Sequence, residues 1–472
     1  MKERPNIVYL MTDQQKASAT SVYGNPFVPC PFMDKMAEQG LAFRDTYAAS
    51  SICTPSRASV MTGVHPLVHQ VTCHQNRAPF NLDQLPELLA ASGYYTAVVG
   101  HHEYDRDLDR GWHHQTNMWT RGPIGTAAEF LYGHGRAGYG WASEPLECTA
   151  EEGHAYAVAT RVIHQLDSIQ DSGAPFFLHV PFLEPHPPFY TPPPYDILID
   201  PASLPLPDRG DGANRPQWQD ACRQEQASHL ATEDDIRRLI AIYYGMIAYV
   251  NDQMQRIYDA MRLRGMLDNT WIIVASDHGD FLGEKGLFSK TESLYECLLH
   301  VLLIIAPPPH AELKVGKQIE GLVDLIDLFP TILGIAGVDV PEYAQGEDLI
   351  SWVGDGAVEP LRECLFSQVG NYHGHLGQSN YGGTKAGRHP GLVQAARSGS
   401  YSYIRDPDYG DEAYDLTQNP LELNNLIGVD AAEPEPIRQL RSRLGGWEQE
   451  CLDLRARLGV VPGYRGFDEV WE

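Results

Sequence analysis

Residues 271–280 of the chain read WIIVASDHGD, and this stretch decides the fold. Its apolar residues come first, and polar residues that can bind a metal or a substrate follow directly. A short apolar run without alternation is typical of a strand buried on both faces, as in a parallel sheet. Three further stretches have the same form: 7–14 (IVYLMTDQ), 96–103 (TAVVGHHE) and 176–186 (FFLHVPFLEPH).

Helical patterns lie between these strands. Apolar residues at helical spacing occur at 85–89 and 158–169, and a longer apolar stripe runs from a capping box of Thr232 and Asp235 to Val250. Alternation of strands and helices predicts an α/β fold with a mostly parallel central sheet flanked by helices.

We expect two domains. Residues 1–360 are predicted to form the large catalytic α/β domain. Residues 361–472 are predicted to form a small C-terminal α+β domain, with an antiparallel sheet that includes 400–404 and a final helix near 436–454.

The charge balance excludes several partners. The 472 residues include 35 Lys and Arg against 62 Asp and Glu, for a net charge of -27. Such a chain is repelled by nucleic acid and by anionic membrane surfaces, so we expect neither as a partner. Any sulfate or phosphate site must therefore create its own positive pocket from a metal or from Arg and Lys.

Targeting signals and cysteines suggest the compartment. The first apolar run is too short for a signal peptide, and no stretch is apolar enough to span a bilayer. The eight cysteines form no CxxC pair, which suits a reducing environment. The predicted location is the cytoplasm.

Candidate metal ligands follow two of the strands. Ligands bind at the carboxyl ends of the strands in such sheets, so we expect Asp13, Gln14, Asp277 and His278 to converge around one divalent cation. Oxygen ligands suit Ca²⁺ or Mg²⁺, whereas the imidazole favours Mn²⁺ or another transition metal. The alternative is that the two aspartates only cap turns.

Cys53 is the candidate nucleophile, within SSICTPSRASVMTG at residues 50–63. Pro55 suits the first turn of a helix, with Thr54 or Cys53 as its cap. A thiol at a helix N-terminus ionises more easily, and Arg57 adds a cation able to grip a sulfate or phosphate. The alternative is a buried structural cysteine.

The pattern Cys-x-Pro-x-Arg resembles the signature of the formylglycine-dependent sulfatases of the alkaline phosphatase superfamily, close to the branch of the phosphonate monoester hydrolases. Residues 5–15 and 276–283 are similar to the two metal-binding segments of that family, and 185–188 to its histidine loop. The resemblance implies that a formylglycine-generating enzyme converts Cys53 to formylglycine, whose hydrated aldehyde attacks the substrate beside one divalent metal ion, Ca²⁺ or Mn²⁺.

The resemblance also implies roles for individual residues. Lys290 binds the substrate, His186 protonates the leaving group, and His101 is the base that helps to release the product. The implied catalytic residues are Cys53, Arg57, His186, Lys290 and His101; the metal ligands are Asp13, Gln14, Asp277, His278 and Cys53; further substrate contacts are Asn76, His102 and Glu103.

One segment departs from the family. Sulfatases usually carry Gly-Lys-x-His after the corresponding strand, whereas residues 100–103 read GHHE, so His101 and Glu103 stand in place of the lysine and the histidine. Gln14 and His278 are also closer to the phosphonate monoester hydrolases and to choline-sulfatase-like enzymes. Because of these departures, the sequence does not decide whether the substrate is a sulfate ester or a phosphonate monoester.

The remaining histidines allow a second interpretation. His101, His102, His113 and His114 surround Asp105, Asp107 and Asp109, a cluster that could be read as a second metal site. His101 or His102 in the substrate pocket is favoured instead, because no tight ligand spacing defines such a site. We expect no chemical role for His134, His154 or His164.

The sequence thus predicts a metal-dependent hydrolase, arylsulfatase-like, that acts on a small anionic sulfate ester and releases sulfate and an alcohol or phenol. One alternative is a phosphonate monoester or phosphodiester hydrolase on the same site. Another is a non-catalytic anion-binding relative with unmodified Cys53. A homo-oligomer is compatible with the family, but nothing in the sequence indicates an interface.

Overall fold

The computed structural model describes most of the chain. The described residues are 4–72, 76–77, 79, 81–102, 110–118, 149–210, 215–354, 360–370, 392–428, 433–460 and 463–464, with 76–77 and 463–464 described by their backbone alone. All structural statements refer to these residues.

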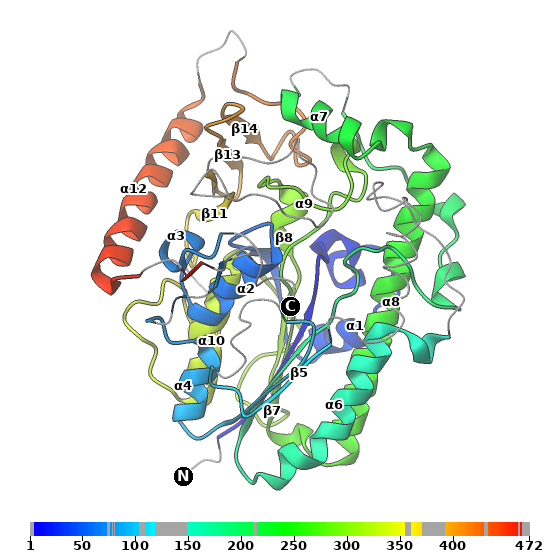
Figure 1. Cartoon of the computed structure of the whole chain (residues 1–472), viewed down its shortest axis with the longest axis vertical. Coiled ribbons are helices and arrows are strands. Elements are labelled where there is room, and N and C mark those ends of the chain that lie inside the picture. Colours follow the sequence, from blue (N-terminus) through cyan, green and yellow to red (C-terminus); the bar gives the residue numbers. More distant parts are fainter. Residues whose placement is uncertain are drawn as a thin grey trace.

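A nine-stranded, mostly parallel sheet forms the centre of the molecule (Figure 1). Its order is β10-β2-β9-β7-β1-β6-β4-β5, with β8 paired to β2. Only β9 and the short β8 run antiparallel to their neighbours. The predicted α/β class is therefore confirmed. The strands are β1 (Asn6–Thr12), β2 (Leu41–Tyr47), β4 (Tyr95–Gly100), β5 (His114–Asn117), β6 (Phe176–Pro181), β7 (Thr270–Ser276), β8 (His300–Val301), β9 (Leu303–Ala306) and β10 (Lys317–Asp324).

The central strand β1 is buried on both faces. Val8 and Leu10 point into one hydrophobic cluster, whereas Ile7, Tyr9 and Met11 point into the other. Each face of the sheet needs an apolar residue at every second position, so two buried faces require a continuous apolar run. This geometry is the reason that the strand sequences do not alternate.

Helices cover both faces of the sheet (Figure 1). The first cluster lies under α1 (Pro31–Glu38), α6 (His154–Asp171) and α8 (Glu233–Leu263). The second lies under α2 (Cys53–Thr62), α4 (Leu85–Ala91) and α10 (Leu328–Ala336). The shorter helices are α3 (Pro66–His69), α7 (Gln217–Glu225), α9 (Glu296–Leu299) and α11 (Leu349–Gly354).

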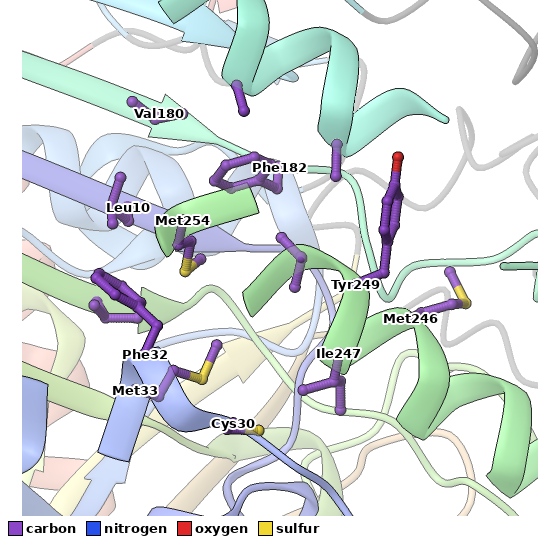
Figure 2. Packing of buried hydrophobic residues seen from close by; sticks show 14 of the residues in the cluster. Leu10, Cys30, Phe32, Met33, Val180, Phe182, Met246, Ile247, Tyr249 and Met254 are labelled. Carbon is purple, nitrogen blue, oxygen red and sulfur yellow. The ribbon is translucent and has the colours of Figure 1, made fainter. Parts of the chain in front are cut away.

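The three predicted helices are α4, α6 and α8. The long helix α8 begins after Thr232, whose hydroxyl accepts a hydrogen bond from the backbone N–H of Asp235, as the capping box predicts. Figure 2 shows Met254 of α8 close to Phe32 and Met33 of α1, and Met246 and Ile247 of α8 belong to the same hydrophobic cluster. This packing holds α8 against the sheet, close to the ends of the strands.

A second, antiparallel sheet lies near the C-terminus. It consists of β11 (Leu365–Val369), β12 (Val393–Arg397), β13 (Tyr401–Arg405) and β14 (Glu412–Asp415), and α12 (Glu435–Leu458) follows it. Ile404 and Tyr414 belong to the same hydrophobic cluster as Ile7 of β1. The two sheets thus share a core, and the boundary at 360 stays a prediction. The short strand β15 (Gly463–Tyr464) returns to pair with β3 (Asn76–Arg77).

Among the helices of the described ranges, none is both long enough and apolar enough to cross a bilayer.

The packing of α8 gives a prediction about stability. Ile247 is fully buried in the cluster of Figure 2, whereas Leu263, at the end of the same helix, is 79% exposed. Ile247→Ala should lower the free energy of unfolding by about 2–5 kcal/mol, because it removes buried methyl groups and leaves a cavity. Leu263→Ala should change it by less than about 0.5 kcal/mol. Urea denaturation followed by circular dichroism measures both, and equal effects would contradict this account of the core.

Candidate active site

Two adjacent strands deliver the acidic residues. Strands β1 and β7 pair in parallel with Thr12 opposite Ser276, so Asp13 and Asp277 leave the sheet side by side. With Cys53 and His278 they form a buried cluster whose ligand atoms all lie within 4.8 Å of one another. The predicted convergence at the carboxyl edge of the sheet is present. Turn capping alone does not explain it, because the four side chains face one another.

Cys53 is the first residue of α2, and Ile52 is the N-cap. The predicted cap, Thr54 or Cys53, is therefore wrong by one or two positions, although the cysteine still lies in the first turn. Its Sγ is 3.1 Å from His278 Nε2 and 3.5 Å from Asp13 Oδ1. The thiol thus faces the polar cluster.

Arg57 binds both carboxylates of the cluster. Its side chain is 1% exposed; Nη2 donates to Asp13 Oδ2 at 2.6 Å and Nε to Asp277 Oδ2 at 2.8 Å. Its Nη1 donates to the backbone oxygen of His101 at 2.7 Å. The guanidinium therefore balances the two carboxylates, and its contact with a sulfate or phosphate stays a prediction.

Gln14 occupies a turn that α8 holds in place. Its φ is 67°, in the left-handed region, and its backbone oxygen accepts a hydrogen bond from Tyr243 Oη at 2.6 Å. Its Nε2 donates to Asp280 Oδ2 at 2.5 Å and to Ser289 Oγ at 3.1 Å. Among the residues with described positions, no partner reaches the buried Oε1 of Gln14.

These side chains fit a divalent cation. Two carboxylates and an imidazole surround one point, and Gln14 Oε1 is a buried acceptor without a donor. A polar atom buried without a partner is costly, and a cation beside it would remove that cost. Oxygen atoms with one imidazole are a donor set for Ca²⁺ or Mn²⁺.

The pKa directions of His278 and Asp277 favour the metal-binding forms of these side chains, whereas that of Asp13 opposes it. Burial, helped by the charge of Lys290, lowers the pKa of His278 to about 4, so the imidazole is neutral and can act as a ligand at pH 7. Burial opposes ionisation of Asp277, but neighbouring charges, including those of Arg57 and Lys290, lower its pKa below the usual range. Burial and the charge of Asp277 raise the pKa of Asp13.

Lys290 completes the cluster. Its Nζ lies 2.7 Å from Cys53 Sγ and 3.0 Å from His278 Nε2. Burial works to lower the pKa of Lys290, but Cys53, Asp13 and Asp277 raise it above its ordinary value. The lysine is therefore charged at neutral pH and brings a cation to the thiol.

The histidine candidates lie around this cluster. His101, at the end of β4, is buried, and its Nε2 is 3.8 Å from Asp13 Oδ2. His102 is also buried, and its backbone oxygen accepts a hydrogen bond from Asn117 Nδ2 at 3.4 Å. His186 follows β6 and is half-buried, with Nδ1 2.6 Å from the backbone oxygen of Pro187.

Some predicted residues are not placed. Glu103, His134 and the aspartates 105, 107 and 109 lie outside the described residues, as does the side chain of Asn76. Within the described part, the only grouping of metal-ligating side chains is the one that contains Asp13. His113 lies beside the start of β4, where its Nδ1 is 2.8 Å from Thr96 Oγ1, whereas His101 follows the end of that strand. The second metal site therefore gains no support from the described histidines.

Sequence analysis missed three residues that hold the site. Asp280 anchors the Gln14 amide, and burial raises the pKa of Asp280. Glu184 accepts a hydrogen bond from the backbone N–H of Ala155 at 2.9 Å, while its own backbone oxygen accepts one from Asp13 at 3.4 Å. Asp280 could have been found from its place after the metal segment. Tyr243 had no such signal, since it belongs to an apolar helical stripe.

Comparisons with known proteins agree with this geometry. The sequence model of the family described as sulfatase matches residues 5–338, and that of the C-terminal part of N-sulphoglucosamine sulphohydrolase matches 283–450. An arylsulfatase of Clostridium perfringens (strain 13 / Type A) is 27% identical, over 94% of this chain and 96% of its own. A choline-sulfatase of Rhizobium meliloti (strain 1021) is 26% identical, over 96% of this chain and 89% of its own.

A solved structure has the same fold. The crystal structure of the phosphonate monoester hydrolase of Agrobacterium radiobacter superposes with a TM-score of 0.76 at 23% identity, over 98% of this chain and 100% of that one. The likeness extends over both sheets.

The role of Arg57 can be tested by stability. In EDTA, Arg57→Met should lower the free energy of unfolding by about 3–5 kcal/mol, because Asp13 and Asp277 would then be buried without their partner. Arg262→Met is the control: its ion pair with Asp259 is exposed, and the loss should stay below about 1 kcal/mol. If denaturant titration gave the same stability for Arg57→Met and the wild type, the guanidinium would not be the partner of these carboxylates.

Proposed function

Because the chain belongs to the sulfatase family, and so to hydrolases that act on sulfate or related esters, we propose that it hydrolyses small anionic sulfate esters. The nucleophile is a formylglycine made from Cys53 by a formylglycine-generating enzyme, and the products are inorganic sulfate and an alcohol or phenol. The proposed compartment is the cytoplasm, as the sequence predicts.

The surroundings of Cys53 carry this proposal. A cysteine kept for packing has apolar neighbours. Cys53 instead contacts His278, Asp13 and Lys290, whose Nζ is 2.7 Å from Sγ. A nucleophile at this position would meet a fixed cation and the ligands of a divalent metal.

The residues that would hold the metal are Asp13, Gln14, Asp277 and His278, with the modified side chain at position 53 as a further ligand. When bound, Ca²⁺ or Mn²⁺ would lower the pKa of a hydroxyl on the hydrated aldehyde and neutralise charge on the ester oxygens. Arg57 binds both carboxylates, and Cys53, Asp13 and Asp277 raise the pKa of Lys290, so the lysine stays charged.

A side chain of the protein can be assigned to each remaining step of the reaction. Lys290 stabilises the oxygens of the group under attack. His186 transfers a proton to the departing oxygen as the bond from sulfur to that oxygen breaks. A protonated Nδ1 of His186 would donate to the backbone oxygen of Pro187, 2.6 Å away, which orients Nε2 as the proton donor. His101, beside Asp13, is the proposed base that removes the proton of the second hydroxyl when sulfate is released.

A phosphonate monoester or phosphodiester hydrolase on the same site is the second candidate. The specific observation in its favour is the segment 100–103, which replaces the lysine and histidine typical of sulfatases. His101 Nε2 lies 3.8 Å from Asp13 Oδ2, so an imidazole would take the place of a lysine ammonium.

The proposed modification of Cys53 has a direct readout. In protein from the native host, the tryptic peptide that contains residue 53 should be about 18 Da lighter than the cysteine form. Cys53→Ala should lower kcat for an aryl sulfate by at least about 10³-fold, because the nucleophile is lost. An unshifted mass together with full activity of Cys53→Ala would reject the proposed chemistry in favour of an anion-binding relative.

The two candidate substrates are separated by a paired assay. Wild-type protein and Cys53→Ala are given an aryl sulfate and an aryl phosphonate monoester with the same phenol, so that only the transferred group differs. Higher kcat/KM for the sulfate supports the first candidate, and the reverse order supports the second.

The role of His186 predicts a dependence on the leaving group. His186→Ala should lower kcat by about 10²–10⁴-fold for an alkyl ester, whose alcohol needs a proton to leave, and far less for a nitrophenyl ester. The matched control is His164→Ala, for which no chemical role is expected. A uniform loss with every leaving group would contradict general-acid catalysis by His186.

A further inference from the structure

A pocket lined by basic side chains lies beside the loop that carries Lys290. Arg209, Arg215 and Lys285 are among its lining residues. Nearby, Arg223 of α7 packs on Gly286, where an added Cβ would meet Arg223 Nε at 3.0 Å. Four cations thus gather in one place on a chain whose net charge is -27.

Two N–H donors of these arginines have no acceptor among the described residues. Arg209 Nε and Arg223 Nε are buried, and neither has a hydrogen-bond partner among the described residues. Burial lowers the pKa of Arg223, and the charges of Arg215 and Arg209 lower it further. The side chains of Arg215 and Arg223 are 12% and 23% exposed, so solvent screens the repulsion between their charges only in part, and an anion between them would reduce it.

The described carboxylates Glu422 and Asp220 do not supply that anion. Glu422 lines the pocket, but its Oε1 accepts a hydrogen bond from Arg397 at 2.6 Å and its Oε2 accepts one from the backbone of Glu296 at 2.7 Å. Asp220 is 3.2 Å from Arg215 and 3.7 Å from Arg223, but it is 68% exposed. One solvated carboxylate shared by two arginines leaves positive charge in excess.

The same loop connects this pocket to the proposed active site. Backbone hydrogen bonds from Phe281 to Ser289, at 2.9 Å, and from Gly283 to Leu287, at 2.8 Å, fold 281–289 into a hairpin-like turn. Lys285 and Gly286 form its tip at the pocket, and the base continues into Lys290 at Cys53. Gly286 and Lys290 are four residues apart, and four residues of extended chain span at most about 14 Å. The pocket end of the loop and Lys290 are therefore no farther apart than that.

The segment before α8 holds the tip in place. Ser228 Oγ donates to the backbone oxygen of Gly286 at 2.7 Å, and Gln226 Nε2 donates to that of Phe288 at 3.0 Å. Lys285 is likewise fixed, since its Nζ donates to the backbone oxygen of Leu421 at 2.8 Å. These hydrogen bonds fix the tip of the turn as one wall of the pocket, while Arg215 Nη2 donates to the backbone oxygen of Arg209 at 2.9 Å.

We propose that Arg209, Arg215 and Arg223 form a second oxyanion site, which takes a sulfate, carboxylate or phosphate group. Guanidinium groups suit such ligands because their N–H donors match the spacing of two oxygens. The anion comes either from a second charged group on the ester substrate or from free inorganic sulfate. The site does not depend on the chemistry proposed for Cys53.

Isothermal titration calorimetry with sodium sulfate tests the site. The wild type, Arg209→Gln, Arg223→Gln, the double variant and the control Arg262→Gln are compared at constant ionic strength, with circular dichroism to verify folding. Each single change should weaken one class of sulfate binding by about tenfold, and the double variant should abolish it. Equal binding by the folded double variant and the wild type would overturn the proposal. Arg209→Lys, which keeps the charge without the fork, should restore binding in part.

A kinetic comparison distinguishes the two sources of the anion. Aryl sulfates with and without a carboxylate on the ring are assayed with the wild type and the double variant. If the anion belongs to the substrate, the double variant should raise KM for the carboxylated ester alone, by about tenfold. If it is free sulfate, KM should be unchanged for both esters while calorimetric binding is still lost. A protein without sulfatase activity would fail this assay, but the calorimetric test would stand.

Discussion

The buried contact of Arg57 with Asp13 and Asp277 is the interaction on which the site depends. Two carboxylates at neighbouring strand ends repel each other, and the guanidinium binds both at 2.6 and 2.8 Å. Because Arg57 lies one turn after Cys53 on α2, these ion pairs also fix the start of that helix against the sheet. The same arginine therefore sets the charge of the site and the place of the thiol.

The net charge of the chain is -27, but positive side chains are grouped at particular places. An acidic chain repels an anionic ester at long range, so binding needs cations that act over a few ångströms. Lys290 supplies one at Cys53, and the arginines of the neighbouring pocket supply others. The loop 281–290 passes through both places, which is a physical reason to expect that both contribute to the choice of substrate.

Much of the architecture could be predicted, and parts of the site could not. Apolar runs without alternation indicated strands buried on both faces, and parallel strands end at one edge, so Asp13 and Asp277 were expected together. The contacts of Arg57 with Asp13 and Asp277 could not be predicted. An arginine near a cysteine in the sequence can bind either an anionic substrate or a carboxylate of the protein itself. Tyr243 was hidden as well: its ring is part of the core, and only its hydroxyl reaches the backbone of Gln14.

The sequence by itself determined the family, the α/β class and the set of polar residues at the strand ends, because these follow from local patterns and motif spacing. The tertiary structure decided which atoms meet. β1 lies between β6 and β7, although these strands are far apart along the chain, and this order results from packing the whole sheet between two layers of helices. Only that packing brings the polar atoms of Cys53, His278 and Lys290 within 3.1 Å of one another and places Arg57 on the two carboxylates.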